Sequence, residues 1–203
     1  MNGDGQTTPA SFEQREPLLS TKLFAPPLRP NRVSRPRLFE WTNSGLDKAL
    51  TLISAPAGYG KTTLASSWVH ELKTPSTWLS LDEGDNDPNR FLQNIIAALQ
   101  KIVPTIQPAW LNLLKGTHPV PYNTLLNILI NEVAAHGAPL VLILDDFHVI
   151  QAQAILDMLD FLLEHRPPHL HLLLISRTDP PLPLFRLRAR DQLVEIRAEQ
   201  RPG

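Results

Sequence analysis

A turn of small residues that ends in Gly-Lys-Thr constrains the fold of this chain more than any other feature. Residues 55–62 read APAGYGKT, which matches the phosphate-loop pattern G-x-x-x-x-G-K-[ST] except that Ala55 replaces the first glycine. An apolar segment, residues 49–54, precedes the loop, and a helical pattern, residues 61–72, follows it. In this order, backbone N–H groups and the positive end of a helix dipole converge on one anion. The pattern therefore predicts a phosphate-binding loop in an α/β fold.

Each position of the loop has a predicted role. Backbone groups would surround the phosphates at Ala57, Gly58, Tyr59 and Gly60. Lys61 would bring a mobile cation to the outer phosphates, Thr62 would offer its hydroxyl to Mg²⁺, and Thr63 would reach the inner phosphate. The alternative is a glycine-containing turn with an incidental lysine. The agreement of loop, strand and helix favours nucleotide binding.

Polar residues at the ends of two later strands complete the predicted site. Residues 140–146 read LVLILDD, a buried strand that ends in two carboxylates. Asp145 would hold Mg²⁺ through a water, and Asp146 would orient or deprotonate an attacking water. Arg177 follows another apolar strand and could contact the outer phosphate. The alternatives are solvated carboxylates and a surface arginine.

Five apolar segments alternate with helical patterns along the chain. The predicted strands are residues 49–54, 77–81, 140–144, 170–175 and 193–196. The predicted helices are residues 61–72, 88–103, 108–115, 122–136, 151–165 and 184–190. This alternation predicts a five-stranded parallel sheet with helices on both faces.

The predicted organisation is one domain with an N-terminal extension. Residues 1–20 are polar and predict a disordered tail. Residues 21–47 combine prolines, arginines and apolar side chains, which favours an extended arm on the domain surface. Residues 48–197 form the nucleotide-binding domain.

Composition excludes several classes of function. Nineteen Lys and Arg against twenty Asp and Glu give a net charge of −1, without the basic field of a stand-alone nucleic-acid binder. The absence of cysteine excludes a disulfide scaffold, a thiol nucleophile and a thiolate zinc site. No apolar run approaches the roughly 18 residues of a membrane span, and no secretory signal begins the chain. We expect a soluble cytoplasmic protein that binds neither DNA directly nor membranes.

Three charged or polar groups have open interpretations. In the acidic segment 82–87, Asp87 is expected to cap a helix and the other side chains to be solvated. The arginines at positions 186, 188 and 190 could sense phosphate, contact another domain or form a solvated face. His169 and His171 lie on one strand face and are expected to be structural.

Four segments of the chain resemble the ATPase module of MalT-like regulators. These are the large ATP-dependent LuxR-type transcription regulators, a family within the STAND branch of P-loop ATPases. The resembling segments are residues 54–64, 78–88, 144–148 and 187–196. The arm, through residues 19–23 and 32–38, resembles the start of such regulators. The resemblance extends over residues 18–197.

The resemblance implies a nucleotide-controlled switch with strand order 5-1-4-3-2. Such regulators bind ADP at rest and ATP when an inducer is present; ATP then favours self-association and promoter binding, and hydrolysis resets the switch. Lys61 and Thr62 would bind nucleotide and Mg²⁺, Asp145 and Asp146 would form the second motif, and Arg177 would be the sensor. The arm would lie near the adenine, with Arg32, Val33 and Arg35 as its nearest residues.

Family members continue through a winged-helix domain, inducer-binding superhelical repeats and a DNA-binding helix-turn-helix. Residues 198–203 are therefore expected to be a truncated end, and any hydrolysis by this chain is expected to be slow. One alternative is a small-molecule kinase with the Arg-rich segment 186–190 as a lid. The paired carboxylates at a strand end favour the hydrolase-type branch of P-loop proteins over a kinase. Another alternative is an interaction module whose phosphate loop no longer binds nucleotide.

Overall fold

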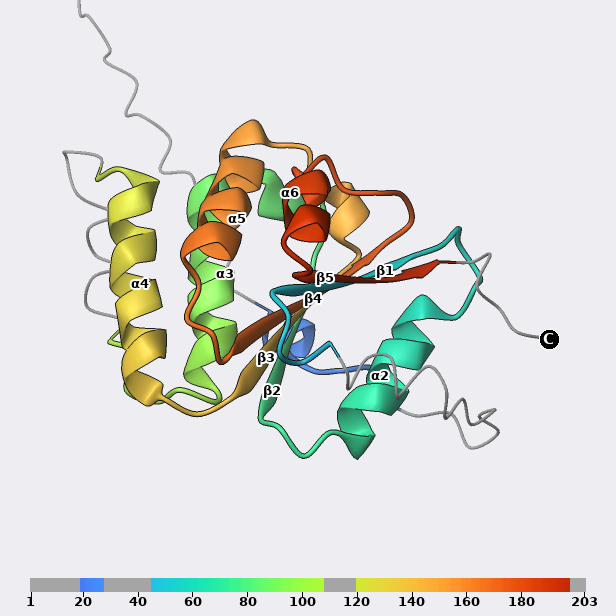
Figure 1. Ribbon diagram of the computed structural model, residues 1–203, viewed down its shortest axis with the longest axis horizontal. Helices are drawn as coiled ribbons and strands as arrows, with labels where there is room; N and C mark the ends of the chain where they lie inside the picture. Colours follow the sequence, from blue (N-terminus) through green and yellow to red (C-terminus); the bar gives the residue numbers. More distant parts are fainter. Residues whose placement is uncertain (1–18, 28–44, 108–119, 198–203) are drawn as a thin grey trace, which may run out of the picture.

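Five parallel strands form a single sheet in the computed structural model, which describes residues 19–27, 45–107 and 120–197 (Figure 1). The strands are β1 (Leu50–Ser54), β2 (Ser76–Ser80), β3 (Leu140–Asp145), β4 (Leu170–Ser176) and β5 (Leu193–Arg197). Their order across the sheet is β2-β3-β4-β1-β5, and every neighbouring pair is parallel. The predicted fold class and strand order are confirmed.

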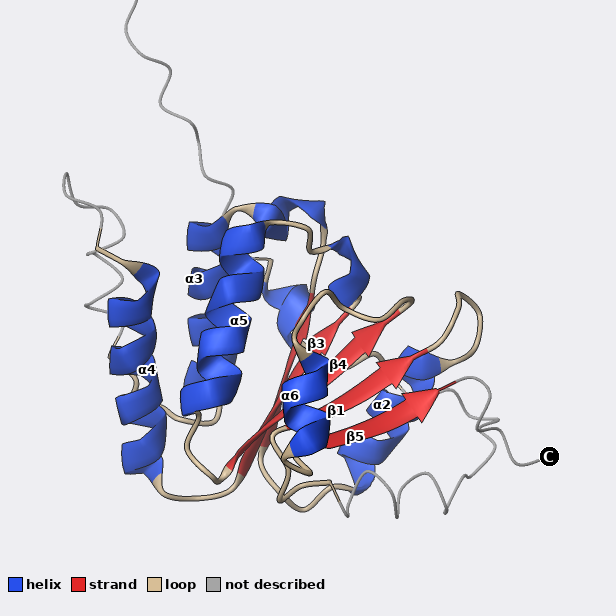
Figure 2. Cartoon of the chain, turned by 45° about the horizontal axis from the view of Figure 1, so that its top comes forward, coloured by secondary structure: helices blue, strands red, loops and turns tan. Residues whose placement is uncertain are grey.

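Helices cover both faces of the sheet, as Figure 2 shows. The α-helices are α2 (Lys61–Glu71), α3 (Pro88–Gln100), α4 (Tyr122–His136), α5 (Gln153–His165) and α6 (Leu184–Ala189). Short 3₁₀ helices are η1 (Ser20–Leu23), η2 (Glu83–Asn86) and η4 (Phe147–Val149). Helix α2 lies on one face, whereas α3, α5 and α6 lie on the other, with α4 packed beside α5. The predicted helix at residues 108–115 lies outside the described residues.

The apolar run of β3 is continuous because the strand is buried on both faces. Leu142 and Leu144 pack into the larger core with α3, α4 and α5. Val141 and Ile143 point the other way, into a smaller core that contains Trp68 of α2. Side chains alternate between the faces of a strand, so both cores draw on the same six residues. The sheet thereby holds the end of β3, where the carboxylates begin, in a fixed position.

Local sequence signals set the helix ends. The Asp87 carboxylate accepts a hydrogen bond from the Arg90 backbone N–H at 2.7 Å, and Pro88 occupies the first turn of α3. Gly137 ends α4 with a φ of 70°. The expectation for Asp87 is confirmed. Within the described part of the chain, no helix combines the length and apolar character needed to cross a membrane.

Residues 21–27 of the predicted arm, together with Leu19 and Ser20 of the predicted tail, are described by the structure and lie against the domain. The Ser66 hydroxyl of α2 donates to the Pro26 carbonyl at 2.6 Å. The Lys101 ammonium donates to the Leu23 carbonyl at 2.6 Å and lies 3.8 Å from the centre of the Phe24 ring. Arm residues 28–44, including Arg32, Val33 and Arg35, and the ends 1–18 and 198–203 lie outside the described residues.

The acidic segment 82–87 is only partly solvated, so that expectation was wrong. Asp85 is fully buried, and its carboxylate accepts a hydrogen bond from the Lys22 ammonium at 2.5 Å. Lys22 is itself buried in η1 and lies 2.9 Å from the Asp82 carboxylate. A buried carboxylate requires a partner of this kind, because desolvation of an unpaired charge is costly. The partner comes from 63 residues away in the sequence.

Candidate nucleotide-binding site

The phosphate loop connects the end of β1 to the start of α2. Gly58 and Gly60 have φ values of 81° and 73°, in the left-handed region that glycine adopts without a steric penalty. Ala55 has no positive φ, and its N–H donates to the Ser176 carbonyl at 3.3 Å. Alanine therefore fits where the pattern has its first glycine, while the later two positions keep glycine for a backbone reason.

Lys61 begins α2 and reaches back across the loop. Its ammonium donates to the Pro56 carbonyl at 3.0 Å. Burial and the positive charge of Arg177 lower the pKa of Lys61, whereas Asp146 and Asp145 act to raise it. The lysine thus lies among the charged residues that the sequence assigned to the site.

Thr62 and Asp145 join the loop to the end of β3. The Thr62 hydroxyl donates to Asp145 Oδ1 at 3.2 Å, and the Asp146 N–H donates to the same oxygen at 2.9 Å. Asp145 is buried, and this burial together with the neighbouring Asp146 charge raises the pKa of Asp145 to about 6. A carboxylate and a hydroxyl side by side are hard oxygen donors of the kind that Mg²⁺ prefers.

Asp146 has an unusual backbone conformation. Its φ is 56°, in the left-handed region, which costs most residues with a Cβ about 1–2 kcal/mol and aspartate less. Its side chain is half exposed, and His148 Nδ1 lies 3.8 Å from its Oδ1. Strained residues of this kind cluster at functional sites. The Asp146 carboxylate lies close to His148 of η4, just beyond the end of β3.

His148 is a site residue that sequence reasoning did not single out. Burial and the charge of Arg177 lower the pKa of His148. Its Nδ1 atom is buried and has no hydrogen-bond partner in the described part of the chain. The only sequence signal was its place two residues after Asp146.

The structure brings Lys61, Thr62, Asp145 and Asp146 together at the carboxyl end of the sheet. Arg177 follows β4 and is exposed; its charge influences the pKa of both Lys61 and His148. The loop residues Ala57, Gly58, Tyr59 and Gly60, with Thr63 of α2, are exposed. Ligands of parallel sheets bind at this end of the strands.

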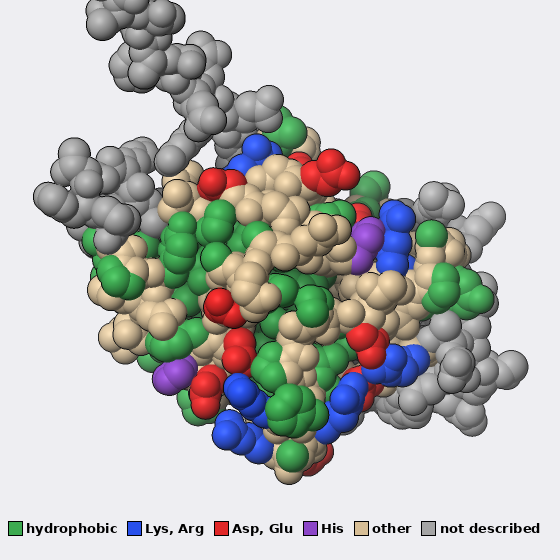
Figure 3. Space-filling view, turned by 90° about the horizontal axis from the view of Figure 1, so that it is seen from above, with side chains coloured by type: hydrophobic (Ala, Val, Ile, Leu, Met, Phe, Trp, Pro, Cys, Tyr) green, Lys and Arg blue, Asp and Glu red, His purple; other side chains and the backbone are tan. Residues whose placement is uncertain are grey.

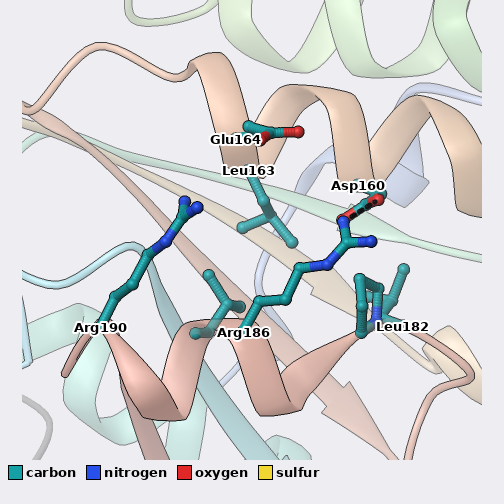
Figure 4. A pocket seen from close by; sticks show the side chains of 8 residues that line it. Asp160, Leu163, Glu164, Leu182, Arg186 and Arg190 are labelled. Carbon is teal, nitrogen blue, oxygen red and sulfur yellow. Dashed lines mark hydrogen bonds and ion pairs between the residues drawn. The ribbon is translucent and has the colours of Figure 1, made fainter.

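The Arg-rich helix α6 is tied to the domain. Arg186 pairs with Asp160 of α5 at 3.3 Å, and Arg188 pairs with Glu195 of β5 at 2.8 Å. Figure 4 shows Arg186 and Arg190 on one side of a small hollow, facing the α5 residues across it. None of the residues that line the hollow belongs to the phosphate loop. Leu184 of α6 is also buried in the larger core, which argues against a free lid of the kind that the kinase alternative requires.

Comparison with known proteins identifies the family. Residues 32–177 match the family described as Nephrocystin 3, N-terminal. The chain belongs to this family. It is also similar to the HTH-type transcriptional regulator MalT of Cronobacter sakazakii, with 39% identity over 183 residues, and to MalT of Serratia proteamaculans, with 38% identity over 195 residues. Each match covers 90% of this chain and 20% of the relative, so the chain spans about a fifth of these regulators.

Two solved structures share the fold of this member of the Nephrocystin 3 N-terminal family. A STAND protein with a tetratricopeptide repeat sensor from Pyrococcus horikoshii has a TM-score of 0.59 at 20% identity, covering 85% of this chain and 24% of the other. Cdc6p from Pyrobaculum aerophilum has a TM-score of 0.55 at 13% identity, and the match covers 85% of this chain and 47% of the other. The resemblance to MalT-like regulators is confirmed, and the solved structures share the predicted fold. The roles of individual site residues stay predictions.

The raised pKa of Asp145 predicts a pH-dependent stability. Folding raises the pKa from 3.8 to about 6, so the folded state holds this proton more tightly than the unfolded state. The resulting stabilisation is full below about pH 4 and is lost as the pH rises through about 6. Without nucleotide at pH 8, Asp145→Asn should therefore exceed the wild type in free energy of unfolding by about 2–3 kcal/mol. The difference should shrink toward pH 4.

Urea unfolding at pH 4.5, 6 and 8 measures this difference. Asp157→Asn, which changes an exposed carboxylate on α5, is the matched control and should show no such trend with pH. A wild-type chain that is more stable than Asp145→Asn at pH 8 would contradict the prediction.

Proposed function

We propose that this chain is the ATP- and ADP-binding switch module of a MalT-like transcription regulator. The observation that carries the proposal is the Thr62–Asp145 hydrogen bond, which joins the phosphate loop to the acidic end of β3 beside Lys61. Two glycines in the left-handed region shape the loop that would surround the phosphates. The similarity to MalT regulators over 90% of the chain supports the same assignment.

The residues at the site fit Mg²⁺ as well as nucleotide. Asp145 is a buried carboxylate beside the Thr62 hydroxyl, and both offer oxygen. Among the described residues, no group of three or more His, Asp or Glu side chains is arranged to hold a metal ion. The proposed ion would take Asp145 and Thr62 as protein ligands and phosphate oxygens as further ligands. When bound, Mg²⁺ neutralises the charge of the outer phosphates.

The proposed role of each side chain follows from its position at the site. Lys61 binds the outer phosphates, Asp146 orients or deprotonates a water, and Arg177 contacts the terminal phosphate and registers its loss. Hydrolysis by this route is at most slow and serves to reset the switch. In a full-length relative, the bound nucleotide controls self-association, the response to an inducer and promoter binding.

Direct DNA binding by this chain is not part of the proposal. The chain has a net charge of −1, and Figure 3 shows acidic and basic side chains interspersed over the face in view. Proteins that bind DNA on their own gather basic side chains on one surface. We place the module in the cytoplasm, with residues 21–47 as the arm and residues 48–197 as the nucleotide-binding domain.

Nucleotide should stabilise the folded chain. A ligand at about 100 times its dissociation constant raises the free energy of unfolding by about 2.7 kcal/mol, because it binds only the folded state. We expect this effect from ATP-Mg²⁺ and ADP-Mg²⁺ in a thermal-shift titration. AMP, which lacks the phosphates that Lys61 would contact, is the control and should have little effect. A folded chain that neither nucleotide stabilises would overturn the proposal.

A further inference from the structure

The side chain of Asn86 connects two loops at the carboxyl end of the sheet. Asn86 ends η2, between β2 and α3. Its amide nitrogen donates to the Val149 carbonyl at 2.8 Å. Its amide oxygen accepts from the backbone N–H groups of Gln151 at 2.7 Å and Ala152 at 3.1 Å. One amide group therefore binds three backbone groups of the segment that leads from η4 into α5.

This segment follows directly on the proposed catalytic residue. Asp146 has the left-handed φ of 56°, and the Val149 N–H donates to the Asp146 carbonyl at 3.1 Å. A strained conformation persists only where the surrounding structure holds it. The three bonds from Asn86 fix the chain three to six residues after Asp146. They therefore hold in place the turn that aims the Asp146 carboxylate.

Asn86 is in turn anchored to the N-terminal arm through its neighbour, Asp85. The Asp85 carboxylate accepts from Lys22 at 2.5 Å, from Asn94 at 2.7 Å and from the Asp82 N–H at 2.9 Å. Both Asp85 and Lys22 are buried. Consecutive residues of η2 thus face opposite partners: Asp85 binds the arm, and Asn86 binds the catalytic turn.

We propose that Asn86 is a positioning residue for the proposed ATP hydrolysis, holding the turn that carries Asp146, and that the Lys22–Asp85 pair couples this turn to the N-terminal arm. The inference rests on the proposed function for its catalytic part. The coupling of the arm to the Asp146 turn through η2 is argued only from contacts within the chain. A shift of the arm would loosen η2 and with it the geometry at Asp146.

Amide hydrogen exchange resolved by residue tests the coupling in the 203-residue chain. In Asn86→Leu, the Gln151 and Ala152 amides lose their acceptor and should exchange at least 10-fold faster than in the wild type. In Lys22→Met, the same two amides should exchange at least 3-fold faster, although Lys22 contacts neither. Lys101→Met is the matched control, because Lys101 also binds the arm but not Asp85. It should leave both rates within 2-fold.

The catalytic part is tested by comparing two ligands. ADP-Mg²⁺ with aluminium fluoride mimics the transferred phosphate and its attacking water, whereas ADP-Mg²⁺ alone does not engage Asp146. Asn86→Leu should lower the affinity for the fluoride complex at least 10-fold and leave the affinity for ADP-Mg²⁺ within 3-fold. A purely structural role would weaken both ligands together. Asn86→Asp keeps the acceptor for Gln151 and Ala152 but places a carboxylate oxygen against the Val149 carbonyl, so it should recover only part of the loss.

The possible failures are distinct. Unchanged exchange of Gln151 and Ala152 in Lys22→Met would overturn the coupling to the arm. Unchanged affinity of Asn86→Leu for the fluoride complex, with wild-type binding intact, would overturn the positioning role. A wild-type chain that binds neither ligand would contradict the proposed function and with it the catalytic part of this inference, whereas the exchange rates would still decide the coupling.

Discussion

Lys61→Ala is expected to lower the affinity for ATP-Mg²⁺ by about 1,000-fold, or about 4 kcal/mol. The Lys61 ammonium already lies over the phosphate loop, 3.0 Å from the Pro56 carbonyl, so it needs little rearrangement to reach a phosphate. Hydrogen bonds between charged groups contribute roughly 1.5–3 kcal/mol each, and an ammonium can make two or three. No other lysine in the described part of the chain is placed to replace it.

Fluorescence titration with labelled ATP and ADP measures the loss. Lys73→Ala is the matched control, because Lys73 is an exposed lysine just beyond the same helix and should bind as the wild type does. The free energy of unfolding without nucleotide should change by less than about 0.5 kcal/mol in the control. Equal ATP affinity of Lys61→Ala and the wild type would contradict the placement of phosphate at this loop.

Local patterns in the sequence were sufficient to predict the scaffold of the site. The strand before Ala55 and the helix after Lys61 follow from hydrophobic periodicity and glycine placement, and both form as predicted. The strand order could not be predicted from these local patterns. It came from the resemblance to known regulators, because periodicity alone does not say which parallel strands are neighbours.

Contacts between residues far apart in the chain could not be predicted from the sequence. Asp85 lies in a run of acidic residues that resembles a solvated loop, and its burial depends on Lys22, 63 residues away. No local pattern of an Asp-Asp pair reveals the left-handed φ of Asp146. The role of Asn86 was hidden for the same reason, since its partners are backbone groups 63 to 66 residues further along.

Removal of the Asp85 carboxylate should produce a large loss of stability. Asp85→Ala leaves the Lys22 ammonium, 8% exposed, without its closest partner in a buried position. Loss of one member of a buried ion pair typically costs about 3–5 kcal/mol, because the remaining charge stays desolvated. The half-exposed Asp82 carboxylate, 2.9 Å from the Lys22 ammonium, offsets part of this cost. Asn94 also loses the acceptor of its 2.7 Å hydrogen bond. We therefore expect a loss at the lower end of this range, about 3 kcal/mol, in urea unfolding.

A double variant separates the charge effect from packing. Replacing both members, Lys22→Met with Asp85→Leu, removes the unpaired charge and should recover a large part of the loss, as apolar replacements of buried pairs often do. Glu83→Ala, an exposed carboxylate in the same short helix, is the matched control and should change stability by less than about 0.5 kcal/mol. A loss below about 1 kcal/mol in Asp85→Ala would mean that the arm is not anchored through this pair.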